Sequence, residues 1–295
     1  MANIKTFDEV LRVVLNDKQS GSADVLQKLI RQILAYLNDM DNPTEGLTEI
    51  QNRLPLITES LSHFAVVDHF LSQFREALSR YEDKSYHVGD LAEFVKGYEQ
   101  TWKNINEKIA DMAFKNLDCQ GKTILLHSNS SVIVSYFEKL KNEGVSANVI
   151  QTESRPENEG RIQAEQIAGM GFEVRFVVDA AAAAMLNEVD MMITGADQVH
   201  PDYFVNKIGT YPLALACRDK KIPLFVLADS RKMSENSADP ESLHNIQKPG
   251  SDIWKTSPTN IRPLNFYFEP IPCELVRSFV TESHIIMPSL INQPD

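Results

Sequence analysis

The chain has 295 residues, of which 43% are hydrophobic and 24% are charged, a composition typical of a soluble globular protein with one or two domains. Its 41 acidic residues outnumber the 29 Lys and Arg residues, which gives a formal net charge of −12. This charge argues against binding to nucleic acid or to an anionic membrane, because phosphate contacts require cations and the bulk field repels a polyanion.

The three cysteines, Cys119, Cys217 and Cys273, are too few and too widely spaced for a disulfide framework, and no Cys/His spacing indicates a metal site. Free thiols are typical of a reducing compartment, so we expect a cytoplasmic protein without a metal or cofactor. The first fifteen residues contain acids and lack a small-residue cleavage site, which argues against a signal peptide. No apolar run approaches the roughly 18 residues that a transmembrane helix needs.

Residues 1–116 show a helical pattern. From residue 22 to residue 40, apolar side chains recur at three- and four-residue spacing and form one stripe. Further helical stretches are predicted over residues 48–80 and 91–117, so we expect three or four helices packed as a bundle. The aromatic residues of this half are interpreted as core rather than as a cofactor site.

After residue 116 short apolar runs alternate with helical segments. Strands are predicted at 123–126, 147–151, 174–178, 191–194 and 224–228, and helices at 131–142, 160–170, 180–188 and 210–220. Such βαβ units predict a parallel sheet with helices on both faces, so the chain is expected to be an α/β protein with domains at 1–116 and 117–295. Residues 230–258 are predicted to form a long surface excursion, for which a lid and an irregular loop remain equal alternatives.

Ligands bind to such sheets at the carboxyl ends of the strands. The first predicted strand is followed by His127, Ser128, Asn129, Ser130 and Ser131, a polar turn that can hold an oxyanion but that routine helix capping also explains. The second strand is followed by Arg155, which can bind a phosphate bidentately. A salt bridge from Arg155 to Glu153 or Glu159 is the alternative.

The fourth strand leads into Gly195, Ala196 and Asp197, where a carboxylate can act as an acid or base. Asn206 and Lys207 follow, and residues 209–210 open a helix whose start can bind an anion. This combination predicts a site for a phosphorylated polyol or sugar. The alternative is a structural ion pair between Asp197 and Lys207.

These motifs, in this order, resemble one family: the alpha, beta and delta subunits of translation initiation factor 2B, methylthioribose-1-phosphate isomerase and ribose-1,5-bisphosphate isomerase. The matching residues are TESRP at 152–156, GAD at 195–197, NKIGT at 206–210, NFYFEPIP at 265–272 and the segment 281–288. The resemblance implies a helical N-terminal domain and a Rossmann-like C-terminal domain that forms a homodimer or a higher homo-oligomer. Segments 265–272 and 285–288 are expected to lie in the shared interface.

The resemblance also implies roles for individual residues. Asp197 falls on the catalytic aspartate of the isomerases, and their catalytic cysteine falls on Ser128, which lacks the thiol. Arg155, Asn206 and Lys207 fall on positions that contact the sugar phosphate.

The substrate-binding element of the helical domain falls on Gly21 and Ser22, but Ser20 replaces its arginine. A second expected arginine is replaced near Ser62 and His63. Lys18, His63 and His127 are candidate substitutes for the missing groups.

From these residues we expect a protein that binds a phosphorylated pentose-type sugar, and two activities remain open. One is aldose–ketose isomerisation, an intramolecular oxidoreductase reaction with Asp197 as acid and base. The alternative is a non-catalytic regulatory subunit of the initiation factor 2B type whose sugar-phosphate pocket is allosteric. The intact Asp197 favours the first, and the missing thiol and arginines favour the second.

Overall fold

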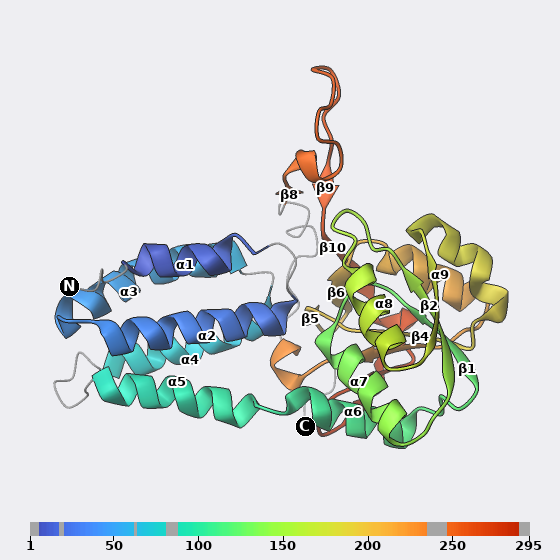
Figure 1. Ribbon diagram of the computed structural model, residues 1–295, viewed down its shortest axis with the longest axis horizontal. Helices are drawn as coiled ribbons and strands as arrows, with labels where there is room; N and C mark the ends of the chain where they lie inside the picture. The colour runs from blue at the N-terminus through green and yellow to red at the C-terminus, as the bar shows by residue number, and fades with distance from the viewer. Residues whose placement is uncertain (1–5, 18–20, 62–63, 81–87, 235–246, 289–295) are drawn as a thin grey trace. The chain divides into compact units, whose positions relative to one another are not determined.

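The computed structural model describes residues 6–17, 21–61, 64–80, 88–234 and 247–288. The chain divides into two compact units, Met1–Asn104 and Ile105–Asp295. Among the described residues the first unit is helical, and the second contains the strands (Figure 1). The predicted fold class, a helical N-terminal region followed by a parallel sheet with helices, is confirmed.

The described part of the first unit consists of helices whose apolar stripes face one another. Leu29 and Ile33, for example, are fully buried. The predicted stretch over residues 48–80 is two helices, because Phe64 has an extended backbone before the second one begins. A helix near the N-terminus was not predicted, although Thr6 and Glu9 form a capping box at its start. The helices are α1 (Phe7–Leu15), α2 (Ser22–Asp39), α3 (Pro43–Leu61), α4 (Ala65–Ser79) and α5 (Val88–Trp102).

The second unit is built on a seven-stranded sheet with the order β12-β11-β7-β4-β1-β2-β3. All neighbouring strands in it are parallel except β11 and β12, which are antiparallel. Its strands are β1 (Lys122–Leu126), β2 (Ala147–Thr152), β3 (Glu173–Val177), β4 (Met191–Thr194), β7 (Leu224–Leu227), β11 (Ser278–Val280) and β12 (Ile285–Ile286). The first five coincide with the predicted strands to within one residue at each end.

Apolar cores cover both faces of this sheet. In β1, the side chain of Leu125 lies in one buried cluster, and those of Ile124 and Leu126 lie in another. Successive side chains of a strand point to opposite faces, so the two clusters are the two sides of the sheet. The helices of this unit are α6 (Ile105–Asn116), α7 (Ser131–Asn142), α8 (Gly160–Gly169) and α9 (Thr210–Asp219).

The position of α6 bears on the domain boundary. Residue 116, where the sequence predicts the boundary, is the last residue of α6. The compact units divide before α6 instead, and this helix packs against α7 of the second unit.

A smaller antiparallel sheet lies beside the main one and was not predicted. It consists of β5 (Gln198–Val199), β6 (Tyr203–Lys207) and β10 (Phe268–Pro272), in the order β10-β6-β5. All five residues of β6 are buried, so this strand fixes Asn206 and Lys207 rigidly. Segments 265–272 and 285–288 thus contain strands that pair within the chain, and their expected role in a shared interface stays a prediction.

The predicted helix over residues 180–188 is a 3₁₀ helix, η2 (Asp179–Glu188). A 3₁₀ helix rises about 2.0 Å per residue, against about 1.5 Å for an α-helix, and this segment must cross from edge strand β3 past β2 and β1 to β4.

The predicted excursion over residues 230–258 is described only in part, because residues 235–246 lie outside the described ranges. Its described elements are η3 (Ser230–Lys232), β8 (Gln247–Lys248) and η5 (Gly250–Asp252); β9 (Asn265–Phe266) pairs with β8, and η6 (Cys273–Leu275) follows β10.

Candidate functional site

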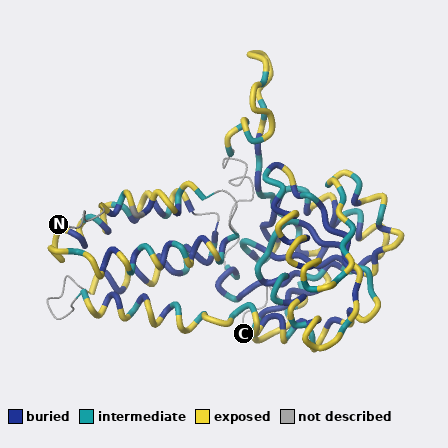
Figure 2. The backbone as a smooth tube through the Cα atoms, viewed as in Figure 1, coloured by how far each residue is buried: buried dark blue, intermediate teal, exposed yellow. Residues whose placement is uncertain are grey.

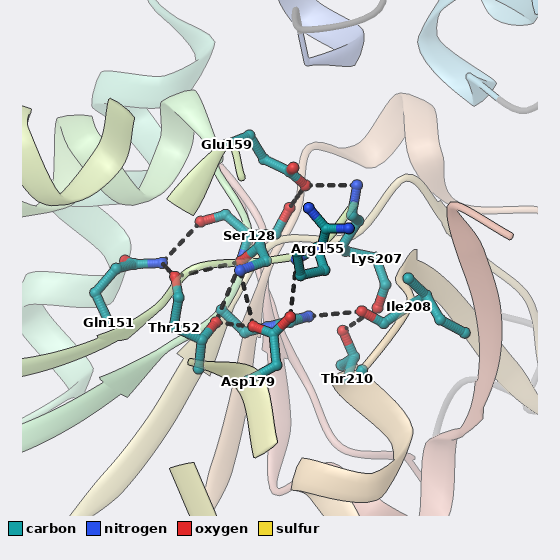
Figure 3. Close-up of polar contacts among 12 residues, drawn as sticks. Ser128, Gln151, Thr152, Arg155, Glu159, Asp179, Lys207, Ile208 and Thr210 are labelled. Carbon is teal, nitrogen blue, oxygen red and sulfur yellow. Dashed lines mark hydrogen bonds and ion pairs between the residues drawn. The ribbon is translucent and has the colours of Figure 1, made fainter. Parts of the chain in front are cut away.

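The carboxyl ends of β1, β2, β4 and β7 lie side by side in the main sheet, and a polar segment follows each of them. Figure 3 shows the residues that meet there from β2, β6, the first residues of η2 and α9, and the loops after β1, β2 and β6. The sequence-predicted residues Ser128, Arg155 and Lys207 are among them. The arrangement matches the general rule for ligand sites in parallel sheets.

A buried hydrogen-bond chain fixes the loop after β1. Burial lowers the pKa of the His127 imidazole, so the ring is neutral near pH 7. Its Nε2–H donates to the carbonyl of Ile208 (2.9 Å), so Nδ1 accepts from the Thr152 hydroxyl (2.6 Å). Ser154 Oγ lies 3.1 Å from Thr152 Oγ1 and accepts the backbone N–H of Ser128 at 2.7 Å. Because both ring nitrogens bond to protein groups, His127 is a structural residue of the site.

The backbone at Ser128 and Ser154 is left-handed, with φ of 70° and 62°. Non-glycine residues adopt this conformation at a cost and are enriched at functional sites. The Asp179 carboxylate stabilises the second turn, because it accepts the backbone N–H groups of Ser154 (2.7 Å) and Arg155 (2.8 Å). Asp179 therefore holds the backbone of the Arg155 loop.

An ion pair lies at the centre of the site. Lys207 Nζ lies 2.8 Å from Glu159 Oε1, and the Ser128 hydroxyl donates to the same oxygen at 3.2 Å (Figure 3). Both charged side chains are buried, with 6% and 11% of their surface exposed. The Lys207 ammonium also lies 4.6 Å from the ring centroid of Tyr267, a cation–π contact. Lys207 thus has Glu159 as its ion-pair partner, a pairing that the sequence did not predict.

Glu159 has an unused acceptor. Its Oε2 atom is buried and has no hydrogen-bond partner among the described residues. Native proteins rarely leave a buried carboxylate oxygen unsatisfied, so this oxygen can accept a hydrogen bond from a water molecule or from a hydroxyl of a bound molecule. Arg155 is exposed, and within the described part of the chain its guanidinium has no ion-pair partner. The predicted alternative, a bridge from Arg155 to Glu159, is therefore not formed.

The residues at the start of α7 serve the local structure. The Ser130 N–H donates to Gln163 Oε1 (2.9 Å), and Ser131 Oγ accepts from the Asn106 amide (3.0 Å). Asn129, which precedes them, is half-buried. The Ser130 amide is thus occupied by a side chain of α8, and a ligand would meet the side chains of this turn rather than that backbone donor.

Asn206 directs its amide hydrogens into the protein. They donate to the hydroxyls of Thr194 (2.8 Å) and Thr210 (2.9 Å), which leaves the amide oxygen as the group able to meet a ligand.

The expected anion site at the start of α9 is already filled. Glu269 accepts the backbone N–H groups of Gly209 (2.7 Å) and Tyr211 (2.9 Å), so a carboxylate of the chain occupies this helix terminus.

Asp197 follows β4 in a half-buried position, and its backbone N–H donates to the carbonyl of Val205 (2.8 Å). The preceding loop packs closely on the start of α7, because a Cβ atom on Gly195 would lie 2.6 Å from Ser130 Oγ and would displace that hydroxyl. Lys232, from the segment after β7, donates its Nζ–H to the carbonyl of Ala196 at 2.6 Å. Lys232 is buried, and no carboxylate among the described residues pairs with it.

Sequence reasoning missed Lys232 and the role of Glu159. Lys232 could have been found by the rule already used, since it follows a predicted strand just as Arg155 does. The segment after β7 was instead interpreted as a surface excursion. Glu159 was considered only as a partner for Arg155, because the sequence does not show that β6 brings Lys207 to it.

Other predicted site residues lie elsewhere. Gly21 precedes α2 in the first unit and Ser22 is buried in the first turn of that helix, so their expected ligand contact stays a prediction. Lys18, Ser20, Ser62 and His63 lie outside the described residues.

Cys119, Cys217 and Cys273 are buried, and burial raises the pKa of the Cys217 and Cys273 thiols to about 12. These thiols are therefore poorly suited to proton transfer near neutrality.

No group of three or more His, Cys, Asp or Glu side chains in the described residues is arranged to hold a metal ion. No helix in the described ranges combines the length and the apolarity required to cross a membrane.

Residues 6–288 match the sequence profile of the initiation factor 2 subunit family. A Pyrococcus furiosus protein described as translation initiation factor eIF-2B subunit 2-like is 26% identical over 285 residues, which cover 95% of this chain and 96% of the relative. Ribose 1,5-bisphosphate isomerase of Archaeoglobus fulgidus is 31% identical over 204 residues, which cover 67% of this chain and 63% of that enzyme.

The crystal structure of 5-methylthioribose 1-phosphate isomerase from Pyrococcus horikoshii has the same fold. It superposes with a TM-score of 0.79 over 96% of this chain and 85% of the enzyme, at 18% identity. At this identity the similarity establishes the fold alone.

Proposed function

The chain belongs to the initiation factor 2 subunit family, and on this premise we propose that it binds a phosphorylated pentose-type sugar at the carboxyl ends of β1, β2, β4 and β7. The ribose 1,5-bisphosphate isomerase relative supports this class of ligand, because its substrate is a pentose that carries phosphates. The proposed phosphate contacts are the cations Arg155 and Lys232. The proposed contacts to sugar hydroxyls are Glu159, Asn206 and Lys207, with Asn129, Ser130 and Ser131 at the rim.

One pair of unmet groups carries the proposal. At the same edge of the sheet, Lys232 is a buried ammonium without a carboxylate partner among the described residues, and Glu159 Oε2 is a buried carboxylate oxygen without a donor. Each would cost free energy if left as it is. A phosphorylated polyol meets both needs, because its phosphate pairs with the cation and its hydroxyl donates to the carboxylate.

The chemistry of the site favours binding without turnover. Ser128, at the position expected for a catalytic cysteine, donates its hydroxyl to Glu159, and a serine hydroxyl is a far weaker acid than a thiol. The cysteines of the chain are buried at other places. This supports a regulatory role of the initiation factor 2B type, in which the sugar phosphate acts as an effector.

Isomerisation remains a second candidate because of one residue. Asp197 lies at the end of β4, where a carboxylate can face the carbons of a sugar bound between Lys207 and Lys232. Proton transfer between adjacent carbons by such a base is the step that interconverts an aldose and a ketose. Ser128 would assist only as a hydrogen-bond donor.

We expect ribose 1,5-bisphosphate or a related pentose phosphate to raise the thermal stability of the chain, by about 2.7 kcal/mol at a hundredfold excess over Kd. Lys232→Gln should weaken binding at least tenfold, because a charge-assisted contact contributes about 1.5–3 kcal/mol. Glutamine can still donate to the Ala196 carbonyl, so the loop is retained. Lys220→Gln, at the exposed end of α9, is the matched control and should bind like the wild type.

Phosphorus NMR of the same mixtures tests the choice between binding and turnover. We expect no product with the wild type, and we expect Asp197→Asn to bind at least as tightly, because it removes a negative charge near a phosphate. Product that appears with the wild type and disappears with Asp197→Asn would establish the isomerase instead. Ser128→Cys completes the series, since a restored thiol should increase turnover only in an arrangement built for catalysis.

The proposal includes a cytoplasmic location and a homo-oligomeric state. The buried free thiols support the location, because a reducing compartment keeps cysteines unpaired.

A further inference from the structure

Tyr267 lies where the candidate ligand site meets a projecting segment of the second unit. This segment, residues 247–266, here called the arm, contains β8, η5 and β9 and extends away from the main sheet in Figure 1. Its two strands pair with each other and with no other described strand, and Figure 2 shows its tip as exposed. Tyr267 lies between β9 and β10 and is buried. The proposed ligand contacts all lie outside the arm, and Tyr267 contacts both regions.

On the side of the ligand site, Tyr267 holds two separate groups. Its ring centroid lies 4.6 Å from the Lys207 ammonium, and its hydroxyl donates to the Glu157 carboxylate. Burial and the neighbouring carboxylates raise the pKa of the phenol, so the phenol keeps its proton near pH 7. Glu157 lies in the loop after β2, two residues beyond Arg155. Tyr267 therefore holds both a cation of the site and the loop that carries Arg155.

On the other side, the same hydroxyl contacts the base of the arm. Asp252 Oδ2 lies 3.0 Å from Tyr267 Oη and accepts the side-chain amide of Asn265 at 3.3 Å. The same amide donates to the Pro249 carbonyl (2.9 Å), which joins the two sides of the arm. Lys248 Nζ lies 5.6 Å from the centroid of the Tyr267 ring. A two-stranded ribbon is marginally stable by itself, so the stability of the arm depends on these contacts at its base.

The Tyr267 hydroxyl has one proton and two carboxylates within hydrogen-bond distance. Asp252 already accepts from Asn265, whereas Glu157 has no other donor among the described residues. The proton is therefore assigned to Glu157. When the Arg155 loop moves away and takes Glu157 with it, the hydroxyl is left with the arm alone. The Tyr267–Glu157 bond is thus the connection that either joins the loop to the arm or releases it.

We infer that Tyr267 couples the proposed ligand site to the arm. The inference rests on the proposed function for the identity of the ligand, whereas the connection between the loop and the arm is a property of the chain alone. A ligand that contacts Arg155 and Glu159 orders the loop, keeps Glu157 at Tyr267 and thereby stabilises the arm. By thermodynamic linkage, an attached arm favours ligand binding to the same extent. Tyr267 is a positioning residue, because it acts through Lys207 and Glu157.

Hydrogen exchange measured by mass spectrometry on the full chain tests the connection without a ligand. Tyr267→Phe keeps the ring beside Lys207 but removes the hydroxyl. We expect it to accelerate exchange about tenfold in two segments, residues 153–160 and the arm, because a hydrogen bond to a charged group is lost. Glu157→Ala should have the same effect. Glu157→Gln should retain most of the protection, because its amide oxygen still accepts from the phenol.

Tyr211→Phe is the matched control, since it removes a hydroxyl from an exposed side chain of α9 and should exchange like the wild type. Acceleration in only one of the two segments would overturn the inference. So would equal acceleration in the core strands β1 and β2, because that result would show a general loss of stability rather than a local connection.

Ribose 1,5-bisphosphate at a hundredfold excess over its Kd for each protein provides the second test. In the wild type we expect the ligand to slow exchange at least tenfold both in residues 153–160 and in the arm, because opening of either then requires release of the ligand. In Tyr267→Phe we expect protection of residues 153–160 alone, since the arm opens without the loop. Equal protection of the arm in the two proteins would overturn the inference, as would an unprotected arm in a wild type that calorimetry shows to be saturated. Absence of calorimetric binding would contradict the proposed function instead, and the exchange of the ligand-free variants then decides the coupling.

Discussion

Lys207→Met is expected to lower the free energy of unfolding by about 3–5 kcal/mol, because it leaves the buried Glu159 carboxylate without its ion-pair partner. It also removes the cation–π contact with Tyr267. The affinity for a pentose phosphate should fall at least tenfold in the same variant. Chemical denaturation measures the first effect, and calorimetric titration of the ligand measures the second.

The double variant Lys207→Met/Glu159→Gln separates these two effects. Replacing the carboxylate by a neutral amide removes the unpaired buried charge, so most of the lost stability should return. The ligand site, however, still lacks both charges, and binding should remain weak. A double variant as unstable as Lys207→Met would show that the Lys207–Glu159 pair is not the origin of the effect.

Gly160→Ala is expected to be the most disruptive single-methyl change in the second unit. A Cβ atom at this position would lie 2.0 Å from the backbone carbonyl oxygen of Thr152 and 3.0 Å from Ser154 Oγ. A backbone atom cannot move aside as a flexible side chain can, so we expect a loss of roughly 3 kcal/mol in the free energy of unfolding. The clash also displaces the neighbouring Glu159, so ligand affinity should fall.

Gly169→Ala is the matched control for this prediction. Gly169 lies in the same helix, α8, and a Cβ atom there would have no neighbour within 4 Å. Alanine in place of glycine stabilises a helix by up to about 1 kcal/mol. Equal denaturation midpoints for the two variants would mean that the close approach of α8 to β2 does not constrain the site.

The regular part of the second unit could be predicted because hydrophobic runs and helical stripes depend on local sequence alone. β1, β2 and β4 were predicted nearly to the residue for that reason. The β6–β10 pairing could not be predicted, because it joins segments about sixty residues apart and Tyr203–Lys207 alternates neither like a surface strand nor like a helix. Without that pairing, the sequence offers no way to bring Lys207 to Glu159.

The same limit applies to the individual site residues. Arg155 and Asp197 were predicted as site residues because each directly follows a strand, a relation that is visible in the sequence. Whether a given polar group is available to a ligand depends on its tertiary contacts. At the start of α9 the backbone N–H groups already bond to Glu269, and both ring nitrogens of His127 already bond to a carbonyl and a hydroxyl of the chain. Conversely, the orphaned oxygen of Glu159 is visible only once the neighbouring side chains are placed.

The proposed ligand site and the stability of the second unit depend on the same contacts. Lys207 lies in β6 and Glu159 is the N-cap residue of α8. The Ser128 loop beside them is fixed by the hydrogen-bond chain that runs from His127 through Thr152 to Ser154. A preorganised site of this kind loses little conformational freedom when a ligand binds, which favours affinity. It also means that a change at one of these residues affects both properties.

Calorimetric titration of ribose 1,5-bisphosphate into the wild type and into the Lys207→Met/Glu159→Gln variant tests the central claim most directly. The account predicts saturable binding with one site per chain in the wild type, and an affinity at least tenfold lower in a variant that is folded and nearly as stable. Absence of saturable binding to the wild type for this and other pentose phosphates, or equal affinity in the two proteins, would contradict it.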